Sequence, residues 1–72
     1  MPNLEPKAIL AELSNTEWER VPGGKAGQRE VVIGHLDEIT FNQAEELYRE
    51  LLPFEVSLIP KNGRLVAHDE MR

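Results

Sequence analysis

The chain has 72 residues, no cysteine and a net charge of −5 at neutral pH. Its length suits one domain over residues 1–72, and the lack of cysteine excludes disulfides and favours a reducing, cytoplasmic setting. Nucleic acids and anionic lipids attract basic surfaces, and no apolar stretch approaches the roughly 20 residues of a membrane span, so we expect no nucleic-acid and no membrane partner.

The first predicted element is a helix over Pro6–Leu13. Proline is tolerated in the first helical turn because its missing N–H would be unpaired there. The apolar residues of this segment fall on one helical stripe: Ile9, Leu10 and Leu13. We therefore expect one face of this helix to cover the core.

The next segment, Glu17–Val21, predicts a short strand with Trp18 facing inward. Its partner is the β-rich segment Arg29–Leu36, reached through the loop Pro22–Gln28. The spacing of Thr16 and Glu19 also matches a capping box, so a further helical turn is the alternative for this segment.

A second helix begins after Thr40, which forms a capping box with Gln43. Ile39 and Ala44 supply a hydrophobic staple, and Pro53 ends the helix. Six apolar side chains recur at helical spacing on one face: Phe41, Ala44, Leu47, Tyr48, Leu51 and Leu52. We expect this face to pack on the sheet.

The last predicted element is a hairpin with the two-residue turn Asn62-Gly63, the preferred type I′ pair. This turn predicts a register in which Leu58 faces Ala67, Ile59 faces Val66 and Ser57 faces His68. The whole order is αββαββ. It predicts an α+β fold with a four-stranded, mostly antiparallel sheet and two helices packed on one face.

A single helical layer leaves the other face of the sheet open. The register places Ile59 and Val66 on that face, and Val32 joins them if Val31 and Ile33 face the helices. Branched residues on an open face suggest that another chain covers them. The sequence thus predicts a small acidic protein-interaction module that forms a homodimer or binds a partner protein, without catalytic activity.

The alternative is a small lyase or dehydratase-like enzyme. Two acid–histidine clusters support it, one beginning at His35 and one at His68 with Asp69. An imidazole beside a carboxylate suits general acid–base chemistry, so His35, His68 and Asp69 are the candidate catalytic residues. The histidines lack a helical metal-ligand spacing, so we expect neither a metal nor another cofactor.

The loop Pro22–Gln28 is rich in glycine, which lets backbone N–H groups converge on an anion. Gly24, Lys25 and Gly27 are therefore candidate ligand-binding residues. The loop lacks the P-loop spacing and joins two strands, so a plain hairpin loop is the preferred interpretation.

Trp18, a strand beginning at Arg29 and the helix opening Phe41-Asn42-Gln43-Ala44 resemble the middle of the pterin carbinolamine dehydratases. The resemblance implies a similar order of helices and strands. That family carries a paired histidine-proline motif after the helix, where this chain has Leu52-Pro53-Phe54. The resemblance therefore does not extend to the activity.

Overall fold

A computed structural model describes residues 3–23 and 27–71. The main elements are α1 (Pro6–Ser14), β1 (Glu19–Arg20), β2 (Gly27–His35), α2 (Phe41–Leu51), β3 (Ser57–Lys61) and β4 (Arg64–Glu70). Short 3₁₀ turns precede and follow α2: η1 (Leu36–Glu38) and η2 (Leu52–Phe54). This order confirms the predicted αββαββ arrangement and the α+β class.

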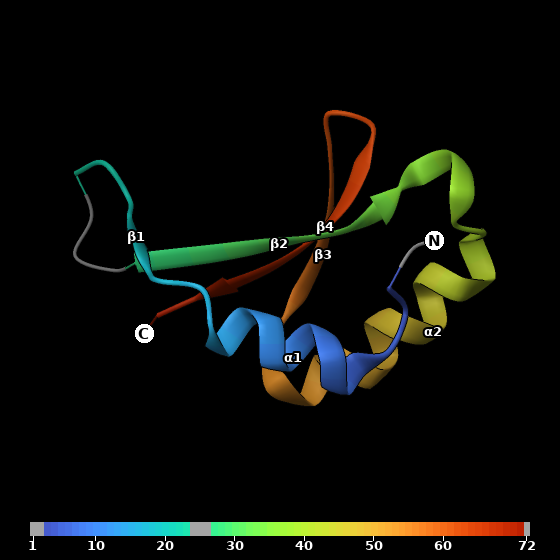
Figure 1. Cartoon of the computed structure of the whole chain (residues 1–72), viewed down its shortest axis with the longest axis horizontal. Helices are drawn as coiled ribbons and strands as arrows, with labels where there is room; N and C mark the ends of the chain where they lie inside the picture. The colour runs from blue at the N-terminus through green and yellow to red at the C-terminus, as the bar shows by residue number, and fades with distance from the viewer. Residues whose placement is uncertain (1–2, 24–26, 72) are drawn as a thin grey trace.

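The four strands form one antiparallel sheet in the order β1-β2-β4-β3. Both helices lie on the same side of this sheet (Figure 1). α1 packs beside β2, and α2 packs beside the edge strand β3. The opposite face carries no layer of described residues, so the predicted open face is present.

The core lies between the helices and the inner face of the sheet. Its buried members are Ile9, Leu13, Ile33, Leu47, Leu51, Val56, Leu65 and Ala67. They come from both helices, from the alternate positions of β2 and β4 that face them, and from Val56 just before β3. No helix within residues 3–23 and 27–71 is long and apolar enough to cross a membrane.

The predicted hairpin is confirmed. Ile59 pairs with Val66 across β3 and β4, and Asn62 and Gly63 have φ angles of 52° and 75°. Positive φ at both central positions is the signature of a type I′ turn.

The predicted start of α2 is also confirmed. The Thr40 hydroxyl accepts a hydrogen bond from the Gln43 N–H, and the Gln43 side chain accepts one from the Thr40 N–H. This capping box satisfies two backbone donors that the helix itself leaves unpaired.

A bulge in β2 settles which way this strand faces. Val32 pairs with Val66, but the next pair is Gly34 with Leu65, so Ile33 is the extra residue. Val31 and Ile33 pack into the core and Val32 is exposed. The sequence shows no sign of this bulge, although it agrees with the outward orientation predicted for Val32.

Two details differ from the sequence analysis. The strand predicted over Glu17–Val21 is only the two-residue β1, and Trp18 lies at the surface with its ring 4.1 Å from the Arg29 guanidinium carbon. The prediction that Trp18 faces inward was therefore wrong. The cation–π contact with Arg29 holds the indole at the margin of the sheet. In α2, only Leu47 and Leu51 are buried, while three members of the predicted stripe are exposed: Phe41, Tyr48 and Leu52.

β3 carries a proline within the strand, Pro60. The pair that closes a two-residue hairpin, here Lys61 and Arg64, is hydrogen-bonded. The neighbouring pair is not, so the nitrogen of Pro60 faces away from β4. β3 has no partner on that side among the described strands, and proline is tolerated there because no ladder bond is lost.

Candidate functional site

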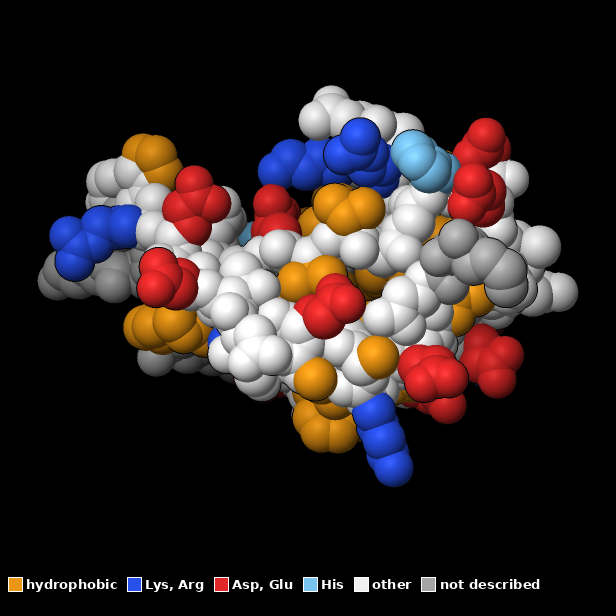
Figure 2. Space-filling view, in the orientation of Figure 1, with side chains coloured by type: hydrophobic (Ala, Val, Ile, Leu, Met, Phe, Trp, Pro, Cys, Tyr) orange, Lys and Arg blue, Asp and Glu red, His pale blue; other side chains and the backbone are white. Residues whose placement is uncertain are grey.

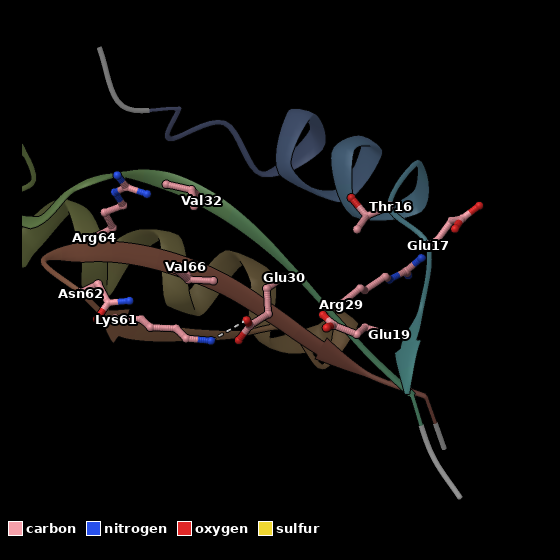
Figure 3. Close-up of a pocket in the computed structure, with 10 residues that line it drawn as sticks. All are labelled: Thr16, Glu17, Glu19, Arg29, Glu30, Val32, Lys61, Asn62, Arg64 and Val66. Carbon is pink, nitrogen blue, oxygen red and sulfur yellow. Dashed lines mark hydrogen bonds and ion pairs between the residues drawn. The ribbon is translucent and has the colours of Figure 1, made fainter. Parts of the chain in front are cut away.

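The open face of the sheet forms a groove of about 330 Å³. The segment leading into β1 makes one wall, with Thr16, Glu17 and Glu19, and the β3–β4 hairpin makes the other, with Lys61, Asn62 and Arg64. Strands β2 and β4 supply the floor (Figure 3). Figure 2 shows the surface hollowed between the β1 region and the hairpin. The twist of the sheet thus makes this face concave.

The predicted interface residues lie on this face, but they differ in exposure. Val66 is only 4% exposed, Ile59 is half-buried, and Val32 is 51% exposed. Lys61 on β3 reaches across β4 and pairs with Glu30 on β2 at 2.9 Å, which brings an ion pair over Val66 (Figure 3). The chain therefore covers part of the predicted apolar patch with its own charged side chains, and Val32 remains the main apolar contact.

The ion pair continues into a histidine on the same face. His68 Nδ1 lies 3.1 Å from Glu30 Oε2, and His68 Nε2 lies 3.1 Å from Glu70 Oε1. Desolvation lowers the pKa of His68, but the hydrogen bonds to Glu70 and Glu30 outweigh it and leave the pKa above its usual value. Hydrogen bonds from Lys61 and then His68 lower the pKa of Glu30.

This arrangement favours a charged imidazole. Each ring nitrogen of His68 faces a carboxylate oxygen, and only the protonated ring can donate from both nitrogens. A general base needs one nitrogen free to accept a proton from a substrate. The geometry therefore favours a structural cross-strand network over base catalysis at His68.

The candidate catalytic residues do not form one site. His35 pairs with Arg64 near the hairpin end of the sheet, whereas His68 pairs with Glu30 further along the same strands. Asp69 points to the other face, where its Oδ2 accepts hydrogen bonds from Arg29 at 3.1 and 2.9 Å. The carboxylates beside His68 are those of Glu30 and Glu70.

Sequence reasoning missed Glu30. Its position opposite His68 follows from the pairing of β2 with β4, and the two residues are 38 positions apart in the sequence, with α2 and β3 between them. The predicted hairpin register covered β3 and β4 only. The alternation of side chains along β2 is the sequence signal that could have identified Glu30, because it puts Glu30 on the same face as Val32.

The glycine-loop candidates gain no support. Gly24 and Lys25 lie outside the described residues. Gly27 is the first residue of β2, and a Cβ there would lie 3.1 Å from the Cβ of Trp18, so its role is to let the indole approach. Within the described ranges, no group of three or more histidine, aspartate or glutamate side chains is placed to hold a metal ion.

Comparison with known proteins assigns no family to this chain. The chain matches no protein-family model, no curated protein and no solved structure.

Proposed function

We propose that the protein is a protein-interaction module whose open-face groove takes a protruding segment of a partner protein. The observation that carries this proposal is the concave groove itself, with Val32 exposed on its floor and charged side chains on both walls. Half-exposed branched side chains within a concave surface favour a convex, partly apolar occupant.

The two walls differ in charge. Glu17 and Glu19 lie on the β1 side, and Arg64 lies on the hairpin side. None of these three side chains has an ion-pair partner among residues 3–23 and 27–71. A complementary segment carries an apolar side chain that contacts Val32. It also carries a basic residue toward Glu17 and Glu19 and an acidic residue toward Arg64.

The shape argues against simple stacking of two open faces. Two flat sheets can bury their floors against each other, but two concave faces meet first at their walls. The floor is then filled only by a segment that protrudes, such as a loop or an extended strand. The proposed occupant of the groove is therefore a segment of another protein.

Selection from a random peptide display library tests the proposal. We expect enriched peptides in which an apolar residue lies between basic and acidic residues. Val32→Glu should weaken their binding at least tenfold, because it puts a charge on the floor. Phe54→Glu, at an exposed apolar site on η2, is the matched control and should leave affinity unchanged.

Amide chemical-shift mapping locates the bound peptide on the folded protein. Shifts at Glu30, Val32 and Val66 are expected. Failure to enrich any peptide, or shifts confined to the helices, would contradict the proposal.

A further inference from the structure

Two exposed apolar side chains of α2, and a third at Leu52 directly after its last residue, form a strip on one flank of the helix. Phe41, Tyr48 and Leu52 are 80%, 44% and 53% exposed. Spacings of seven and four residues keep them within a narrow arc, since each residue turns the helix by 100°. We call these three residues the α2 flank.

The direction of the α2 flank follows from what lies on the other side of the helix. Gln43, Glu46 and Glu50 line a hollow with Leu4, which leads into α1. These positions are about 180° around the helix from Phe41 and Tyr48. The α2 flank therefore faces away from α1, on the side of the edge strand β3 that α2 packs beside.

We propose that the α2 flank is a docking surface for a second copy of this chain, with the two α2 helices antiparallel. The flank is complementary to itself in this orientation. Phe41 meets Leu52 of the second copy at both ends, because the pairing reverses the order of positions. In the middle, Tyr48 meets Glu45 of the second copy, so a phenol donor meets a carboxylate acceptor.

The charges distinguish this arrangement from a parallel one. Parallel helices in register bring Glu45 against Glu45 of the second copy, and like charges in contact disfavour that pairing. The antiparallel arrangement separates the two Glu45 side chains. Glu45 also lies 2.6 Å from Arg49 on its own helix, which holds the carboxylate beside the flank.

The interface is small. One face of an 11-residue helix lies at the low end of the areas that stable complexes bury, so we expect a concentration-dependent dimer. Helix α2 lies on one side of the sheet (Figure 1), and the groove lies on the opposite face, so the two proposals stand independently.

Sedimentation equilibrium on the full chain tests the dimer. Replacing Phe41→Glu and Leu52→Glu together should raise the dimer dissociation constant at least tenfold. Both sites are exposed, so the variant should keep the wild-type circular dichroism spectrum. Phe54→Glu, the matched change elsewhere on the helical layer, should not alter dimerisation. A wild type that stays monomeric at millimolar concentration overturns the proposal.

Disulfide trapping tests the orientation, because the chain has no cysteine of its own. A mixture of Phe41→Cys and Leu52→Cys single variants should cross-link into the mixed dimer faster than either variant alone. Faster cross-linking of Phe41→Cys with itself indicates a parallel pair and overturns the antiparallel assignment. Amide chemical shifts that change on dilution at Val32 and Val66, and not on α2, would place self-association in the groove. That outcome would overturn this proposal, although the groove would remain a binding site.

Discussion

At the scale of single residues, the most consequential arrangement is the network of Lys61, Glu30, His68 and Glu70. It links all three long strands on the open face, and its geometry favours the charged form of His68 and raises its pKa. Only 13% of the His68 side chain is exposed, so solvent screens this pair less than a surface pair. The network therefore ties the stability of the sheet to pH.

The sign follows from the two pKa directions. A raised pKa at His68 stabilises the fold below the unfolded value of about 6.5, and this contribution is lost as pH rises through the folded pKa. A lowered pKa at Glu30 stabilises the fold above about pH 4.5, and this contribution is lost as pH falls through the folded pKa. Both contributions are present together between about pH 4.5 and 6.5.

His68→Gln should therefore cost up to about 1 kcal/mol near pH 5.5 and less by pH 9, measured by urea denaturation at each pH. His35→Gln is the matched control, since the His35 side chain is exposed and makes no hydrogen bond or ion pair within the described ranges. Its effect should not vary in the same way. Equal pH profiles for wild type and His68→Gln would rule out this role for the network.

At the scale of elements, local signals located the helices and the hairpin well. The capping box at Thr40 and the turn at Asn62-Gly63 act within a few residues, so the sequence alone is enough to read them. The prediction for β1 was less accurate, because this strand is held by tertiary contacts. These are the contact between Trp18 and Arg29 and the close approach of Trp18 to Gly27. Such tertiary contacts have no local pattern.

The cap at Thr40 gives one test at this scale. Thr40→Ala should lower the free energy of unfolding by about 1 kcal/mol, because the Gln43 N–H loses its acceptor. Thr40→Ser keeps the hydroxyl and should restore most of the loss in thermal or urea denaturation. An alanine variant as stable as wild type would show that the box contributes little.

The turn at Gly63 gives a second test at the scale of elements. Gly63→Val should destabilise the fold by about 1–2 kcal/mol, because a branched residue resists the φ of 75°. A Cβ at this position meets no atom within 4 Å, so the loss measures backbone strain and not a clash. Gly63→Asn, which tolerates positive φ, should lose less. Equal losses for valine and asparagine would contradict this explanation.

At the scale of the whole molecule, the order of elements and the open face were predictable, but the order of strands in the sheet and the shape of that face were not. The strand order depends on β2 pairing with β4 rather than with β3, which no local pattern reveals. The same long-range pairing brings Glu30 beside His68 and beneath Lys61. Amphipathic spacing predicted the apolar face of α2, but it did not show that Phe41 and Tyr48 stay exposed beside the buried part of that face.

Pro60 has a consequence for how this protein behaves at high concentration. An unpaired edge strand beside an exposed apolar helix flank is the kind of surface from which sheets extend from molecule to molecule. At the outward-facing position of β3, proline offers no N–H to an incoming strand. A strand that adds to this edge therefore loses one backbone hydrogen bond at Pro60, which disfavours growth of a continuous sheet from molecule to molecule.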